Sequence, residues 1–171
     1  MQNNIDELIN NHYAFFKTKR TLDYKYRILY LKKLYKEIKN NIDLINEGLY
    51  KDLGKSPSEA YMCETGLVLS EITYMLKHIK KFSKPRRVRT PLAQYISKSF
   101  ELASPYGVVL VMSPWNYPFL LSLDPIVEAV AAGNVVLLKT SEYSPNTNKV
   151  VKRIIAVSYT HLRAHETLAN L

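Results

Sequence analysis

Two sets of polar residues follow two short apolar runs of the sequence and could together bind a polar ligand. The apolar runs are residues 108–112 and residues 135–138. The polar residues after the first run are Ser113, Trp115, Asn116 and Tyr117, and those after the second are Lys139, Thr140, Ser141, Glu142, Tyr143 and Ser144. Their hydroxyl, amide, ammonium and carboxylate groups supply both donors and acceptors. The chemistry that they offer is recognition of hydrogen-bonding groups on a ligand.

The elements that would position these residues are a strand, a helix and a second strand. Turn residues bound each apolar run, and the segment between the runs is long enough for one crossover helix, so the pattern predicts two parallel strands. The helix contains Asp124-Pro125, where we expect a kink or a restart, and we expect it to stop at Gly133-Asn134. Parallel strands end at the same edge of a sheet, and open α/β sheets bind ligands at that edge.

Four motifs in this region resemble the aldehyde dehydrogenase family. They are PWNYP at residues 114–118, AAGN at residues 131–134, VVLLK at residues 135–139 and KTSE at residues 139–142. Their order and spacing are similar to those at the start of the family's nucleotide-binding domain. The resemblance extends over residues 4–157, roughly the first third of a complete enzyme, and the start looks more like the short-leader, dimeric class 3-like branch.

The resemblance implies a fold and a reaction. The fold is α/β, with an N-terminal helical layer and the first βαβ unit of the Rossmann-like nucleotide-binding domain, truncated before the later strands. The reaction is the NAD(P)-dependent oxidation of an aldehyde to a carboxylic acid by a nucleophilic cysteine and a glutamate that activates water. Both residues are expected downstream of this chain, so the chain itself is expected to be inactive. Cys63 does not match the nucleophile and is interpreted as structural.

The resemblance also implies roles for individual residues. Asn116 would donate to the oxygen of the tetrahedral intermediate, and its alternative role is that of a turn former between two prolines. Lys139 and Glu142 would bind the adenosine ribose of NAD or NADP, with NAD favoured, and their alternative role is a solvent-exposed ion pair. Further cofactor contacts through backbone or packing are expected from Met112, Ser113, Pro114 and Trp115.

Two departures from common patterns accompany the resemblance. Thr140 stands where the family usually has proline, so the turn after the second strand is expected to be less rigid. The generic Rossmann sequence G-x-G-x-x-G is absent, but the resembled family also lacks it.

Helices dominate the expected structure before residue 105. The expected elements are a helix over residues 4–17 with Asn4 as its cap, one apolar helical face from Leu22 to Leu49, a helix from Ser56-Pro57 to Lys84-Pro85, and an exposed strand over residues 94–102. In the resembled family the last of these regions is a β-hairpin that helps oligomerisation.

These elements divide the chain into four parts. The parts are a helical region of the cofactor-binding domain (residues 1–93), an exposed strand or hairpin for oligomerisation (94–104), the first βαβ-α of the NAD-binding domain (105–157) and a non-native tail (158–171). The tail follows no family pattern and looks like translated sequencing-adapter DNA. Its alternative reading is a metal site, because His161 and His165 are four residues apart and Glu166 follows.

The net charge of +9 suggests an alternative function, the binding of a polyanion. Basic residues cluster between Glu71 and Glu101 with no acid among them, and such a run can follow phosphates. The same run could be a solvated helix end, and no zinc-finger spacing, RNP-like motif or Gly-rich RNA loop accompanies it. We therefore favour the dehydrogenase over nucleic-acid binding. A related acyl-CoA or acyl-phosphate reductase of the same superfold is the other alternative.

The sequence argues against a membrane-spanning protein and against a disulfide-bonded one. No apolar run approaches the roughly 20 residues of a membrane span, and a single cysteine excludes an intrachain disulfide. We expect a cytoplasmic protein that, when complete, acts on a small-molecule aldehyde as a homodimer.

Overall fold

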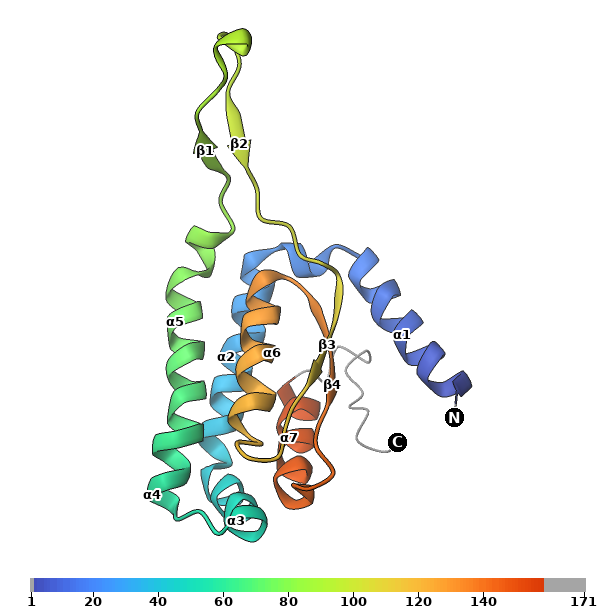
Figure 1. The fold of residues 1–171 in the computed structure, drawn as a ribbon, viewed down its shortest axis with the longest axis vertical. Helices are drawn as coiled ribbons and strands as arrows, with labels where there is room; N and C mark the ends of the chain where they lie inside the picture. Colours follow the sequence, from blue (N-terminus) through green and yellow to red (C-terminus); the bar gives the residue numbers. More distant parts are fainter. Residues whose placement is uncertain (1, 159–171) are drawn as a thin grey trace.

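A computed structural model describes residues 2–158, with side chains from Ile5 onward, and shows helices packed around two parallel strands (Figure 1). The α-helices are α1 (Gln2–Lys17), α2 (Tyr24–Asn40), α3 (Ile42–Leu53), α4 (Pro57–Ala60), α5 (Gly66–Phe82), α6 (Leu120–Ala132) and α7 (Pro145–Ser158). The strands are β1 (Arg86–Val88), β2 (Ser99–Glu101), β3 (Val108–Met112) and β4 (Val135–Lys139). Shorter elements are 3-10 helices at Arg20–Leu22 and Leu92–Gln94 and a π-helical segment at Tyr61–Thr65.

The first two predicted helices differ from the structure in their ends. Helix α1 begins at Gln2, so Asn4 lies inside the helix and the prediction that it is the cap was wrong. The apolar face from Leu22 to Leu49 is formed by two helices, because the helix is interrupted at Asn41. The side-chain amide of Asn41 donates to the carbonyl of Glu37 at 2.7 Å, a local bond that competes with helix continuation.

The predicted helix start at Ser56-Pro57 is confirmed. The hydroxyl of Ser56 accepts from the amide of Glu59 at 3.3 Å, and Pro57 occupies the first turn. Helix α5 ends at Phe82, just before the predicted stop. The π-helical segment was not predicted. Gly66 follows this segment. A Cβ at residue 66 would lie only 2.7 Å from the carbonyl oxygen of Tyr61, so the backbone geometry here favours glycine.

The predicted strand, helix and strand are also confirmed. Strands β3 and β4 pair in parallel, and Asn134 ties their starts together, because its side-chain oxygen accepts from the amide of Gly107 at 3.0 Å. The expected restart of α6 was wrong, since one continuous helix runs through Pro125. Proline removes a single backbone donor, and its neighbours in α6 are buried in the core. The helix stops at Gly133, which has a φ of 95°.

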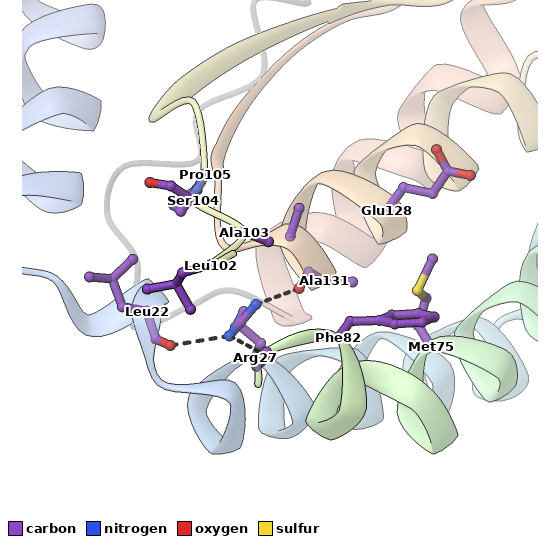
Figure 2. A pocket seen from close by; sticks show the side chains of 12 residues that line it. Leu22, Arg27, Met75, Phe82, Leu102, Ala103, Ser104, Pro105, Glu128 and Ala131 are labelled. Carbon is purple, nitrogen blue, oxygen red and sulfur yellow. Dashed lines mark hydrogen bonds between the residues drawn. The ribbon is translucent and has the colours of Figure 1, made fainter. Parts of the chain in front are cut away.

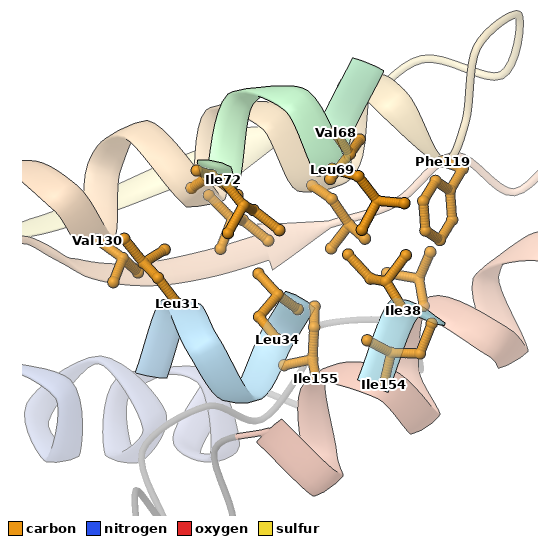
Figure 3. Close-up of a cluster of buried hydrophobic side chains, with 14 of the residues drawn as sticks. Leu31, Leu34, Ile38, Val68, Leu69, Ile72, Phe119, Val130, Ile154 and Ile155 are labelled. Atoms are coloured by element: carbon orange, nitrogen blue, oxygen red, sulfur yellow. The ribbon is translucent and has the colours of Figure 1, made fainter. Parts of the chain in front are cut away.

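The core lies between the strands and the helical layer. Helices α1 and α6 contact the strands and lie on opposite sides of them in Figure 1, and α5 packs on α2 and α6. The buried side chains of this core come from α2 to α7, from β4 and from the loop before α6. Figure 3 labels Leu31, Leu34, Ile38, Val68, Leu69, Ile72, Phe119, Val130, Ile154 and Ile155. Packing of this apolar surface fixes α6, and therefore the loop that precedes it, relative to α2 and α5.

Strands β1 and β2 form an antiparallel hairpin that projects from the helical body (Figure 1). The strand expected over residues 94–102 is present only at Ser99–Glu101, because a 3-10 helix and a turn occupy the start of that range. Its partner β1 lies before residue 94. Within residues 2–158, no helix has the length and apolar content needed to cross a membrane. Ser158 ends α7 and is buried, whereas His161, His165 and Glu166 lie outside the described residues.

Candidate active site

The two predicted polar loops begin side by side at one edge of the parallel strands. Met112 at the end of β3 lies opposite Lys139 at the end of β4. One further bond continues this pairing, since the amide of Ser113 donates to the carbonyl of Lys139 at 3.0 Å. The structure therefore brings the segment that contains Asn116 and the turn that contains Glu142 to the same edge, as the sequence pattern predicted.

Asn116 lies on the loop between β3 and α6, and it is an exposed residue. Its neighbours Trp115 and Tyr117 are also exposed, at 53% and 40%. The backbone carbonyl of Asn116 accepts from the ammonium of Lys55 at 3.2 Å. The backbone of this residue is thus bound to the protein, and the residue itself is exposed.

The residues predicted to contact the cofactor differ in how exposed they are. Met112 is 74% exposed, and Pro114 and Trp115 also present surface. Ser113 is buried, and its hydroxyl lies 2.7 Å from the hydroxyl of Ser122 in α6. Its amide is bonded to β4 as well, so neither the amide nor the hydroxyl of Ser113 is presented to a ligand.

Lys139 and Glu142 lie on the turn after β4. Their charged groups are 4.0 Å apart, and the carboxylate side chain is 81% exposed. The ammonium of Lys139 also donates to the carbonyl of Thr140 at 3.0 Å. Thr140, which stands in place of the family's proline, is buried. An exposed carboxylate beside an ammonium is a donor and acceptor set that fits the hydroxyl groups of a ribose.

A buried ion pair, Lys55–Glu64, lies beneath this loop and is not predicted by the sequence pattern. The ammonium of Lys55 lies 2.5 Å from one carboxylate oxygen of Glu64, and Glu64 is fully buried. The other carboxylate oxygen accepts from the amides of Phe119 at 2.8 Å and Leu120 at 3.1 Å. These amides belong to the start of α6, where a negative charge is favourable.

Lys55 makes two further contacts with the loop that contains Asn116. Besides its bond to the carbonyl of Asn116, its ammonium lies 4.0 Å from the ring centre of Tyr117, a cation-π contact. One sequence signal could have pointed to this network. The residues just before α6 include no Ser, Thr, Asp or Asn next to the helix, so its first amides require an acceptor from elsewhere in the chain.

A pocket lies at the opposite end of α6, near the base of the hairpin (Figure 2). Leu22, Phe82 and Leu102 give it an apolar lining, and Arg27 lies at its wall. The guanidinium of Arg27 donates to the carbonyl of Ala131 at 2.6 Å. None of the predicted site residues lines this pocket among the residues that the structure describes, so it is separate from the strand edge.

Comparison with known proteins decides the family. The family model described as "Aldehyde dehydrogenase family" matches residues 1–158. This chain belongs to the aldehyde dehydrogenase family. The predicted resemblance, including the relation to the class 3-like branch, is confirmed by the relatives described next.

Two curated relatives and one solved structure resemble this family member over most of its length. The chain is 43% identical over 153 residues to 4,4'-diaponeurosporen-aldehyde dehydrogenase of Staphylococcus aureus, covering 90% of this chain and 33% of that protein. It is 39% identical over 155 residues to aldehyde dehydrogenase family 3 member F1 of Arabidopsis thaliana, covering 91% and 32%. The substrate-bound Staphylococcus aureus AldH matches with a TM-score of 0.92 and 40% identity, covering 96% and 36%.

The chain corresponds to only part of each relative. It spans about a third of the length of the curated relatives that it matches. The matched third includes the loop with Asn116 and the turn with Glu142. These comparisons favour the dehydrogenase family over the polyanion-binding alternative.

Proposed function

We propose that this chain provides one part of the active site of an NAD(P)-dependent aldehyde dehydrogenase, which oxidises an aldehyde to a carboxylic acid. One observation supports this function above the others. The parallel pairing of β3 and β4 brings the exposed residue Asn116 and the exposed carboxylate of Glu142 to one edge of the sheet. This edge is where open α/β sheets bind their ligands.

Asn116 would act on the oxygen of the aldehyde carbonyl. When a nucleophile attacks the carbonyl carbon, negative charge develops on that oxygen, and a neutral amide donor stabilises it. One such donor contributes about 2.7–4 kcal/mol to lowering the barrier. Cys63 lies in the π-helical segment next to the buried Glu64, and we assign the nucleophile to a different cysteine, outside this chain.

Lys139 and Glu142 would bind the adenosine ribose of the cofactor, which supplies the hydride acceptor of the reaction. The exposed carboxylate can accept from both ribose hydroxyls. NAD is the favoured form, because the same carboxylate would repel the 2′-phosphate of NADP. Met112, Pro114 and Trp115 offer exposed surface for packing against the cofactor, and Ser113 offers its carbonyl.

The hairpin β1–β2 supports a proposed homodimer. Its tip exposes Leu92, Tyr95 and Ile96 by 87%, 83% and 94% of their surfaces. Exposed apolar residues grouped on one projection are typical of a protein contact. Replacing these three residues by serine should convert a dimer into monomers in light-scattering measurements. We also propose a cytoplasmic location, which cell fractionation would test.

The test of the function is the complete open reading frame. The protein that it encodes should reduce NAD when an aldehyde is supplied, and it should contain a cysteine and a glutamate in family context downstream of residue 158. Absence of both residues would remove the dehydrogenase assignment. Reduction of an acyl-CoA or acyl phosphate, with no aldehyde oxidation, would favour the reductase alternative.

A further inference from the structure

We propose that the buried pair Lys55–Glu64 positions Asn116 for the reaction described above, so this inference rests on the proposed function. Lys55 follows α3, and Glu64 lies in the π-helical segment, so both are distant in sequence from the loop that they contact. Together they bind the Asn116 carbonyl, the Tyr117 ring and the first amides of α6. They act on the reaction through Asn116 and are therefore positioning residues.

The residues that flank Asn116 supply few backbone donors of their own. Pro114 and Pro118 on either side have no backbone N–H, so the loop has fewer donors with which to fix itself. No side chain of the adjoining sequence caps α6. The ammonium of Lys55 binds the loop at the Asn116 carbonyl, and Glu64 binds it at Phe119 and Leu120. The backbone that carries the Asn116 side chain is thus held at two points.

Burial makes these contacts selective for one loop conformation. Lys55 is 8% exposed and Glu64 is fully buried, so both charges depend on protein partners rather than on water. A loop conformation that moved the Asn116 carbonyl or the start of α6 would leave buried charge without those partners. The pair therefore disfavours loop conformations in which the Asn116 carbonyl or the first amides of α6 leave these positions.

A double-mutant cycle in the protein encoded by the complete open reading frame tests the proposal. Lys55→Met removes the ammonium but keeps a side chain of similar length. We expect it to lower kcat by about 10- to 100-fold, the range for a misplaced catalytic group, with little change in the KM for NAD. In the Asn116→Ala background the same substitution should lower kcat no further. Lys55→Arg, which keeps the cation, should restore most of the activity.

Arg27→Met is the matched control. It also removes a buried cation that binds α6, but at the other end of that helix, where Arg27 donates to Ala131. It should lower thermal stability as Lys55→Met does and leave kcat nearly unchanged. An equal kcat loss in this control would overturn the proposal, as would an equal loss from Lys55→Met with and without Asn116.

A second variant, Glu64→Gln, and NMR of the asparagine side chains test the proposal if Lys55→Met does not fold or the complete protein is inactive. If Lys55→Met does not fold, Glu64→Gln replaces it under the same criteria, because glutamine keeps an oxygen for the amides of Phe119 and Leu120. If the complete protein oxidises no aldehyde, the proposed function fails, and NMR of the asparagine side chains decides the positioning. A more mobile Asn116 side chain in Lys55→Met than in Arg27→Met would support positioning, and equal mobility would overturn it.

Discussion

Glu64 and Arg27 bind opposite ends of α6. The carboxylate of Glu64 accepts from the Phe119 amide at 2.8 Å, and the guanidinium of Arg27 donates to the Ala131 carbonyl at 2.6 Å. A negative charge at the start of a helix and a positive charge at its end both match the helix dipole. Burial lowers the pKa of Arg27, and the charge of Asp23 acts in the opposite direction. Side chains of the helical layer therefore hold both ends of the crossover helix, but only Glu64 binds the end that adjoins the loop with Asn116.

The first prediction concerns the proposed oxyanion donor. Asn116→Ala should lower kcat of the complete enzyme by about 10²–10³-fold, because the bond is made to charge that develops during the reaction. The KM for NAD should change little, since Asn116 is not placed at the ribose. Steady-state kinetics with saturating aldehyde would measure both. Asn116→Asp, which has the same shape without the donor, should be equally impaired, and full activity of either variant would mean that Asn116 is only a turn former.

The second prediction concerns cofactor choice. Glu142→Gln removes a charged acceptor, and since hydrogen bonds to charged groups contribute about 1.5–3 kcal/mol, the KM for NAD should rise about tenfold or more. The preference for NAD over NADP should narrow, because the repulsion of the 2′-phosphate is lost. Kinetics with both cofactors would test this. Lys149→Gln, a change at an exposed residue of α7, is a control for the loss of one surface charge. An unchanged cofactor preference would indicate that Glu142 faces only solvent.

The third prediction is a pH dependence of stability at Asp52. Burial tends to raise the pKa of this carboxyl, but bonds from Thr147 and Asn146 at the start of α7 lower it below its ordinary value. The folded-state pKa is thus below the unfolded one, so the stabilisation is present above about pH 4 and is lost as the pH falls through the folded-state value. Asp52→Ala should cost about 1 kcal/mol at neutral pH.

Denaturant unfolding of the parent and of Asp52→Ala across this pH range would measure the effect. The difference between the two proteins should shrink as the pH falls below 4, since the parent then loses its carboxylate. Asp52→Asn keeps an acceptor that does not titrate, and it should show no such convergence with Asp52→Ala. A constant difference at every pH would show that the carboxylate charge contributes nothing.

The fourth prediction concerns the π-helical segment. Gly66→Ala would place a Cβ 2.7 Å from the carbonyl oxygen of Tyr61, so the backbone must shift. Alanine is the better helix former by about 1 kcal/mol, but overpacking against backbone typically costs about 1–3 kcal/mol. The net effect should be destabilisation, measured as a lower thermal midpoint. Ser70→Ala on the exposed side of α5 is the control, and a gain in stability for Gly66→Ala would contradict the π-helical geometry.

The sequence was sufficient to predict the parts of the site that depend on local pattern. Short apolar runs bounded by turns predicted β3 and β4, and their parallel pairing placed Asn116 and Glu142 at one edge. Cap signals such as Ser56 were reliable because the hydroxyl and the amide that it binds are only three residues apart. Glycine at residue 133 marked the end of α6 for the same reason, since a left-handed φ is a property of one residue.

Contacts between distant segments could not be predicted from one sequence. Lys55 and Glu64 look like ordinary charges on helix ends, and only the packing of α5 against α6 brings Glu64 to the amide of Phe119. The break at Asn41 was missed because the apolar spacing continues across it, although the side chain forms a bond that ends α2. The restart expected at Pro125 failed because tertiary burial of α6 outweighs the loss of one backbone bond.

The projecting hairpin also determines where the protein is open to proteases. Strands β1 and β2 pair over three residues each and pack little on the core, so their local unfolding costs little free energy. Arg87, Arg89 and Lys98 in this region are exposed sites for trypsin. Trypsin should cut here first and leave the helical body intact. If the hairpin is the dimer contact, a partner would cover these sites, and the rate of cleavage would decrease as the protein concentration rises.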